Sequence, residues 1–268
     1  MNNDDIDPIK VFLPYRTDEI RDKSCELHGS FKSRNLFRDN WSTCPACLEI
    51  KLVEGNTVKA AQEAAEKLRK WEKRMGQAGI PERFTNRTLD SYNATNDGQR
   101  KALSFAKDYV ANFNDVLSTG RSAIFCGKPG TGKTHLSIGI ALEIMKLKYE
   151  NHYSHYNALF LTVQRMVRRM KESWRKDSDE SESDVMNILV EPELLIIDEI
   201  GVQFGSEFEK NFMFDVLNSR YENHRPTLLL SNLSVAEVKA FLGERIYDRL
   251  REDGGQCVSF DWTSHRGK

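Results

Sequence analysis

Residues 127–134 read Gly127-Lys128-Pro129-Gly130-Thr131-Gly132-Lys133-Thr134 and fit the phosphate-loop pattern G-x-x-x-x-G-K-[ST] at every position. The apolar, turn-bounded stretch before them, 122–126, predicts a buried strand, and 136–145 carries apolar residues at helical spacing. Strand, glycine loop and helix therefore follow in the order that the motif requires. This agreement disfavours a chance glycine turn, and the stretch predicts a nucleotide site.

Each part of the loop has a chemical task. Its glycines let backbone N–H groups curl around phosphate oxygens, and the helix N-terminus adds a positive dipole. Lys133 is expected to reach the β- and γ-phosphates, and the Thr134 hydroxyl to hold Mg²⁺.

Two further apolar runs end in polar residues. Leu194-Leu195-Ile196-Ile197 predicts a central strand buried on both faces, and it is followed by Asp198 and Glu199. Asp198 is expected to bind Mg²⁺ through water, and Glu199 to polarise the attacking water as a general base. A third strand, 227–230, ends in Ser231-Asn232, where Asn232 can touch the γ-phosphate or the lytic water. The pattern predicts an α/β fold whose parallel strands end at one ligand site.

The length and overall composition limit the possible number of domains and the possible partners. The 268 residues suffice for one α/β domain and a small module, and the net charge of −1 provides no overall field toward nucleic acid. No apolar run reaches membrane-spanning length, so no membrane partner is expected. The N-terminus is acidic and lacks the regions of a signal peptide, which predicts a cytoplasmic protein with reduced thiols.

Three of the five cysteines lie between residues 25 and 47. Cys25-x-x-His28 and, after a gap, Cys44-x-x-Cys47 have the spacing of a closed structural Zn²⁺ site. A disulfide is disfavoured because one cysteine would be left over, and unrelated cysteines remain an alternative. Residues 1–50 have too few aliphatic side chains to fold unaided, so a metal would supply the missing stability.

Residues 57–75 are rich in strong helix formers and predict a helical arm. Thr57 is expected to cap its start, and Gly76 and Gly79 to end it. A thin apolar stripe of Val58, Ala61, Ala65, Leu68 and Trp71 or Glu72 is compatible with docking of a partner or with a solvated connector. The expected domains are thus a zinc module over 1–54, an arm over 55–78 and an ATPase domain over 79–268.

A basic helix is expected over 163–176, followed by the acidic run 177–184. Arg165, Arg168 and Arg169 are expected to project outward, away from the predicted core face, and Trp174 lies near the helix end. Cations beside an aromatic ring suit single-stranded nucleic acid, through phosphate contacts and base stacking. The residue types are equally compatible with a solvated basic face on which Trp174 is a packing residue.

Four stretches resemble one protein family. They are 79–84 (Gly-Ile-Pro-Glu-Arg-Phe), 194–232 (Leu-Leu-Ile-Ile-Asp-Glu-Ile-Gly-Val-Gln, then Arg225-Pro226 and Ser231-Asn232-Leu233), 243–250 (Gly-Glu-Arg-Ile-Tyr-Asp-Arg-Leu) and 261–266 (Asp-Trp-Thr-Ser-His-Arg). On these residues the chain resembles DnaC-type replicative helicase loaders, which are AAA+ ATPases. The resemblance covers residues 79–268. The zinc-like N-terminus departs from the best-known bacterial loader and resembles variants of phages and prophages.

The resemblance implies further roles. Residues after Asn232 are too few for a full helical lid, so the chain resembles lidless loaders and IstB-type helper ATPases. Such a site is expected to be completed in trans by an arginine finger, with Arg249 first and Arg245 second, unless these arginines make surface salt bridges with Glu244, Asp248 or Glu252. Arg266 resembles the family's sensor arginine.

Three functions stay compatible with this sequence. The first is an oligomeric loader that binds ATP, Mg²⁺ and Zn²⁺ and delivers a hexameric replicative helicase to single-stranded DNA. The second is an IstB-type transposition helper that binds duplex DNA and a transposase, and the third is a nucleotide-gated adaptor with negligible turnover. The zinc module and arm favour the loader, because loaders grip the helicase with an N-terminal extension.

Overall fold

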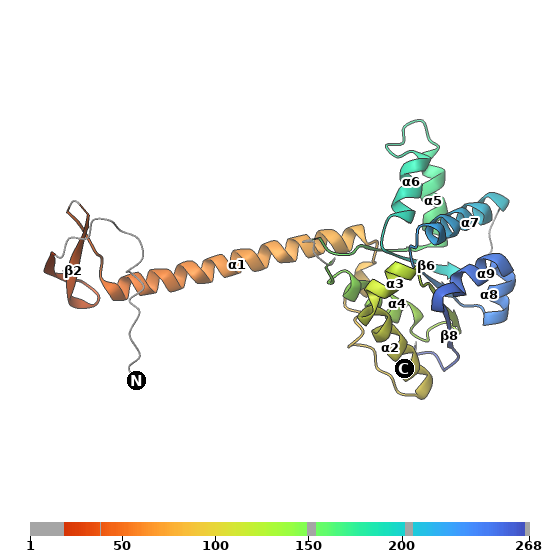
Figure 1. The fold of residues 1–268 in the computed structure, drawn as a ribbon, viewed down its shortest axis with the longest axis horizontal. Helices are drawn as coiled ribbons and strands as arrows, with labels where there is room; N and C mark the ends of the chain where they lie inside the picture. The colour runs from red at the N-terminus through yellow and green to blue at the C-terminus, as the bar shows by residue number, and fades with distance from the viewer. Residues whose placement is uncertain (1–18, 38, 149–153, 202–205, 266–268) are drawn as a thin grey trace. The chain divides into compact units, whose positions relative to one another are not determined.

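The computed structural model describes residues 19–37, 39–148, 154–201 and 206–265 (Figure 1). It does not describe the side chains of Phe37, of Leu68, or of Val58, Ala60, Ala61, Glu63, Ala64, Ala65 and Lys67. Most of the expected apolar stripe of the arm therefore lies outside the described side chains. The chain divides into two compact units, residues 1–71 and 72–268, and each is described by itself.

The first unit contains a small antiparallel sheet. Its strands are β1 (Ile20–Cys25), β2 (Gly29–Phe37) and β3 (Asn40–Trp41), in that order. Gly29 closes the β1–β2 turn with a φ of 75°, a conformation that glycine adopts without strain. Of the side chains of this unit that the structure describes, few are buried, among them Ser33 and Cys44. So small a core cannot supply much hydrophobic stabilisation.

The predicted arm is part of a longer helix, α1 (Pro45–Gln77). Thr57 does not cap its start: its hydroxyl donates to the carbonyl of Glu54, 2.8 Å away, inside the helix. Pro45 occupies the first helical position, where the missing N–H costs nothing. The helix stops before Gly79, whose φ is 66°. It crosses the expected boundary between residues 54 and 55 without a break.

The second unit is built on five parallel strands in the order β5-β6-β7-β4-β8. The strands are β4 (Ala123–Gly127), β5 (Ala158–Thr162), β6 (Leu194–Ile200), β7 (Thr227–Ser231) and β8 (Gln256–Phe260). Leu194 to Ile197 are fully buried, as expected for a central strand. The predicted α/β fold with a central parallel sheet is confirmed.

Helices cover both faces of this sheet. One face carries α2 (Asp97–Ala111) and α4 (Lys133–Ile144), together with α3 (Phe113–Thr119) and the short 3₁₀ turn η1 (Glu82–Phe84). The other face packs against five helices: α5 (Val163–Ser173), α6 (Glu182–Val190), α7 (Glu207–Glu222), α8 (Val235–Leu242) and α9 (Glu244–Arg251). A second 3₁₀ turn, η2 (Glu252–Gly254), connects α9 to β8. In Figure 1, α5 and α6 lie side by side as a hairpin. Among the described residues, no helix is both long and apolar enough to cross a bilayer.

Arg220 of α7 ties this hairpin to the sheet. Its side chain is completely buried, and burial lowers its pKa to about 9, so it stays charged at neutral pH. The guanidinium donates to the carbonyls of Leu189, Val190 and Pro192 at the end of α6, at 2.9–3.0 Å. It also donates to Thr227 and Pro226 at the start of β7. Carbonyls at a helix C-terminus favour a cation, so the buried charge is compensated without a direct carboxylate bond.

Candidate functional site

The glycine loop lies between β4 and α4, as the motif requires. Gly127 has a φ of 120°, and a Cβ atom there would lie 2.6 Å from the carbonyl oxygen of Phe260. Gly132 has a φ of 99°, and its Cβ would lie 2.7 Å from the ring of Tyr92. Both the backbone conformation and the close neighbours therefore require glycine at these two positions.

Lys133 lies over the loop that it belongs to. Its side chain is buried, and the ammonium donates to the carbonyls of Gly127 and Lys128, at 2.6 and 2.7 Å. The loop thus holds a buried cation at its centre, where an anion would find a compensating charge.

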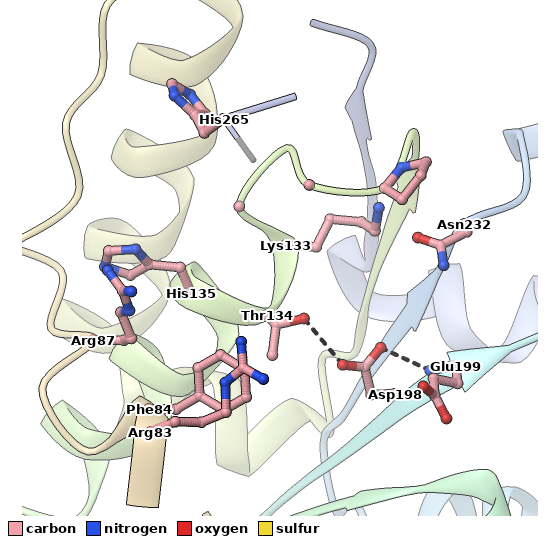
Figure 2. Close-up of a pocket in the computed structure, with 13 residues that line it drawn as sticks. Arg83, Phe84, Arg87, Lys133, Thr134, His135, Asp198, Glu199, Asn232 and His265 are labelled. Carbon is pink, nitrogen blue, oxygen red and sulfur yellow. Dashed lines mark hydrogen bonds between the residues drawn. The ribbon is translucent and has the colours of Figure 1, made fainter. Parts of the chain in front are cut away.

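Thr134, Asp198 and Glu199 form one connected group (Figure 2). The Thr134 hydroxyl donates to Asp198 Oδ2, 3.0 Å away, and the Glu199 N–H donates to Asp198 Oδ1, 2.7 Å away. Glu199 has a φ of 66°, a strained conformation for a residue with a side chain. It coincides with an irregularity in the β6–β7 pairing between Ile197 and Ile200. The strand is thus irregular at the point from which the Asp198 and Glu199 side chains project.

These groups border a cavity of about 430 Å³. Asn232 enters it from the end of β7, so three strand ends meet there. The lining residues predicted from the sequence are Pro129, Gly130, Gly132, Lys133, Thr134, Asp198, Glu199 and Asn232. The predicted loop residues Gly127, Lys128 and Thr131 support the loop without lining the cavity.

Five further residues line the cavity and were missed by the sequence reasoning: Arg83, Phe84, Arg87, His135 and His265. Burial lowers the pKa of His135, which favours the neutral ring, and its Nε2 lies 2.9 Å from the carbonyl of Thr88. The stretch 79–84 was noted only as a domain entry. Its arginine and phenylalanine, side by side, were the available signal for a ligand wall.

The proposed trans arginines lie elsewhere. Neither Arg249 nor Arg245 lines the cavity of its own chain. Arg249 Nη1 donates to Asn218 Oδ1, 2.6 Å away, and its guanidinium lies 4.8 Å from the ring centre of Tyr221. Arg245 is exposed. Arg266 lies outside the described residues.

In the first unit, the four predicted metal ligands come together. The ligand atoms of Cys25, His28, Cys44 and Cys47 all lie within 4.8 Å of one another. His28 Nδ1 lies 3.2–3.7 Å from the three sulfurs, and the sulfurs of Cys25 and Cys47 are 3.5 Å apart. A tetrahedral Zn²⁺ with bonds of about 2.0–2.3 Å separates its ligands by about this much. The donor set and its spacing therefore fit Zn²⁺.

The basic helix differs from the prediction. It ends at Ser173, so Trp174 caps it. The acidic run contacts the helix, because Glu180 makes a two-point ion pair with Arg169. Arg168 lies 3.7 Å from Glu172, whereas Arg165 is exposed and pairs with no acid in the described part of the chain. Trp174 is 48% exposed and packs edge-on against Phe208, with ring centres 4.8 Å apart. Arg165, Arg168 and Trp174 are thus exposed, whereas Arg169 is held by its ion pair with Glu180.

Comparisons with known proteins agree with this geometry. A model of the family described as IstB-like ATP binding protein matches residues 53–254. The replicative helicase loader DnaC of Escherichia coli (strain K12) is 35% identical over 215 residues, which is 80% of this chain and 83% of that protein. DnaC of Buchnera aphidicola subsp. Acyrthosiphon pisum is 35% identical over 75% of this chain and 77% of that protein.

Solved structures share the fold of the second unit. A crystal structure of the DnaC helicase loader matches with a TM-score of 0.58 and 23% identity, covering 68% of this chain and all of that one. The AMPPCP-bound DnaA of Aquifex aeolicus matches with a TM-score of 0.53 and 21% identity, over 66% of this chain and 51% of that one. At this level of identity the likeness concerns the fold alone.

Proposed function

Because the chain belongs to the family of IstB-like ATP binding proteins, we propose that it is an ATP-dependent loader of a replicative helicase. The observation that carries the proposal is the 35% identity with DnaC over most of both chains. The cavity between the glycine loop and the ends of β6 and β7 supplies the matching chemistry.

Each residue of the cavity has a separate role in ATP hydrolysis. Loop N–H groups and Lys133 bind the phosphates, for which Lys133 exchanges its present carbonyl partners. Thr134 and Asp198, already in contact, would hold the Mg²⁺ that accompanies ATP. Glu199 accepts a proton from the attacking water, and Asn232 orients that water or the γ-phosphate.

In this proposal the cavity is completed by a neighbouring copy of the chain. The cavity is open, and Arg249 and Arg245 of the same chain do not reach its wall. Self-association would place Arg249 of one copy against the nucleotide of the next, as an arginine finger acts in trans. Arg249 would then leave Asn218 and Tyr221, its present partners.

Arg249→Ala is expected to bind ATP normally and to lose DNA-stimulated hydrolysis. Mixing it with Lys133→Ala should restore part of the activity, because an interface that joins the cavity of the Arg249→Ala chain to Arg249 of the Lys133→Ala chain has both parts intact. Steady-state ATPase rates at several mixing ratios measure this. If the mixture is no more active than its components and Arg245→Ala is inactive, Arg245 is the arginine finger instead of Arg249.

We further propose that the outer face of α5 binds single-stranded DNA. Trp174→Ala should weaken binding by about 5- to 150-fold, since stacking on an aromatic side chain is worth about 1–3 kcal/mol per base. Arg165→Ala should lower the slope of log affinity against log salt by about 0.7, because one phosphate contact is lost. Fluorescence anisotropy with labelled oligonucleotides at several salt concentrations measures both quantities.

Two controls distinguish this role from packing. Arg100→Ala, on α2, should change neither affinity nor salt slope. Glu180→Gln should strengthen binding, because it releases Arg169 from its ion pair. If Trp174→Ala and Arg165→Ala both fold and both bind single-stranded DNA like wild type, the outer face of α5 is only a solvated basic surface.

Capture of the partner tests the loading function itself. The tagged full chain with ATP should retain a purified hexameric replicative helicase, and should transfer it to single-stranded DNA. The IstB-type alternative predicts preference for duplex DNA and retention of a transposase instead. That second outcome, without helicase binding, would replace the loader proposal.

The zinc site belongs to the same proposal. Cys25, His28, Cys44 and Cys47 would hold one Zn²⁺ that closes the β1–β2 turn onto the first turn of α1. All four positions are filled by protein ligands, so the metal is structural and leaves no open coordination site for catalysis. In the loader, this unit would present the N-terminal surface that contacts the helicase.

A further inference from the structure

The last residue of β8 and the residues that follow it cross the glycine loop and contact it at three successive points. We call residues 260–265 the strap. The Phe260 carbonyl accepts the Lys128 N–H at 3.2 Å, and the Trp262 indole N–H donates to the Thr131 carbonyl at 2.9 Å. The His265 backbone N–H donates to the Gly130 carbonyl, also at 2.9 Å. The strap therefore supplies hydrogen-bond donors to two consecutive carbonyls of the loop.

The strap is packed tightly in this position. The Trp262 ring lies so close to α2 that a Cβ on Gly98 would meet it at 2.9 Å. Its ring centre lies 4.9 Å from that of Phe260, which pairs with Gly127 across the sheet. Thr131 is fully buried beneath these groups. The Thr131 carbonyl also accepts from the Tyr92 hydroxyl, at 3.4 Å, so the Trp262 contact is the shorter and stronger of its two hydrogen bonds.

These two carbonyl contacts orient two N–H groups. In a planar trans peptide, the carbonyl of one residue and the N–H of the next point in opposite directions. The peptides here are trans. With the Thr131 carbonyl held by Trp262, the N–H of Gly132 faces the other way, and with the Gly130 carbonyl held by His265, so does the N–H of Thr131. Gly130 and Gly132 both line the nucleotide cavity.

We propose that Trp262 and the His265 backbone are positioning residues for nucleotide binding, which hold the N–H groups of Gly132 and Thr131 toward the phosphates. The Trp262 side chain and the His265 backbone contact the loop and act on the ligand through it, whereas the His265 imidazole itself lines the cavity. Without these donors, the Gly130 peptide loses its hold, and the Thr131 peptide keeps only the longer Tyr92 contact; a peptide that turns over presents a carbonyl oxygen to the phosphate, which repels it. The inference rests on ATP binding at this cavity, and it is independent of helicase and DNA.

Trp262→Phe tests the indole donor, because it keeps an aromatic ring and removes the N–H. We expect the dissociation constants of ATP and ADP to rise by about 2- to 10-fold, as for one lost hydrogen bond whose acceptor keeps a second donor, here the Tyr92 hydroxyl. Both nucleotides should be affected equally, since both place a β-phosphate in the loop. At saturating ATP, kcat should change by less than about twofold, because the contact serves bound substrate and transition state alike. Trp41→Phe, in the first unit, is the matched control.

The backbone donor has its own test. His265→Ala removes the imidazole and keeps the N–H, whereas His265→Pro removes both. The difference in ATP affinity between these two variants isolates the backbone contact, and we expect the proline variant to bind several-fold more weakly. This pair keeps the proposal testable even if Trp262→Phe folds poorly.

Lys133→Ala separates failure of the strap from failure of the site. If Lys133→Ala abolishes nucleotide binding while Trp262→Phe and His265→Pro bind like wild type, the strap has no positioning role. If Lys133→Ala also binds normally, the cavity is not the nucleotide site, and the premise of the inference falls. A loss of kcat in Trp262→Phe with unchanged affinity would also overturn the proposal.

Discussion

Glu199→Gln is expected to lower the rate of ATP hydrolysis by about 10²- to 10⁴-fold, the usual contribution of a general base. ATP affinity should stay nearly unchanged, because the carboxylate that contacts Thr134 belongs to Asp198. The amide of glutamine has the same shape as the carboxylate and cannot accept the proton. The strained backbone at Glu199 should tolerate the change, since glutamine has the same Cβ and stem.

Two measurements are needed for this prediction. Equilibrium binding of a fluorescent ATP analogue reports affinity, and single-turnover hydrolysis reports the chemical step. Glu191→Gln, an exposed glutamate just after α6, is the control. A Glu199→Gln variant that hydrolyses ATP at the wild-type rate would show that another group activates the water.

Loss of the metal should unfold the small sheet of the first unit and spare the ATPase unit. Structural Zn²⁺ in small modules contributes about 10–16 kcal/mol of apparent binding free energy, which is also folding free energy. The few buried side chains of this unit cannot replace it. Cys44→Ser removes a buried ligand and should therefore abolish stoichiometric Zn²⁺ binding.

Metal analysis and amide hydrogen exchange on the full chain test this expectation. Protein purified without chelator should contain one Zn²⁺ per chain, and residues 20–44 should lose protection in Cys44→Ser. Protection of the β4–β8 sheet should persist. Cys257→Ser, a cysteine outside the cluster, should retain the metal. Zinc-free wild-type protein with a protected β1–β2 hairpin would refute the site.

The first unit and the nucleotide loop illustrate what local sequence can predict. The loop of 127–134 and the ligand pairs 25–28 and 44–47 are short motifs whose chemistry depends on spacing alone. The strand that ends in Asp198 was evident because a fully buried strand is continuously apolar. The resemblance to DnaC-type loaders, first based on a few such stretches, is confirmed by the relatives.

The ends of helices were less predictable. The arm was expected to start at Thr57, because threonine can cap a helix; Gly55 and Asn56 lie just before it. In the structure the helix runs through them from Pro45, whose neighbour Cys47 lies in the metal cluster. Likewise, α5 ends three residues earlier than its composition suggests, where Trp174 packs on Phe208 of α7. Contacts with distant residues decided both ends.

The sequence by itself determined the fold class, the nucleotide loop, the two carboxylates of β6 and the spacing of the four clustered residues Cys25, His28, Cys44 and Cys47. Each of these depends on residues that are neighbours along the chain or on the periodicity of one element. Only the tertiary structure placed Arg83, Phe84 and Arg87 in the cavity wall, paired Arg169 with Glu180, and laid the strap across the loop. Arg169 and Glu180 meet because the chain turns back after α5, whereas the other contacts join segments far apart in sequence, and their geometry depends on how the parallel sheet brings the ends of its strands together.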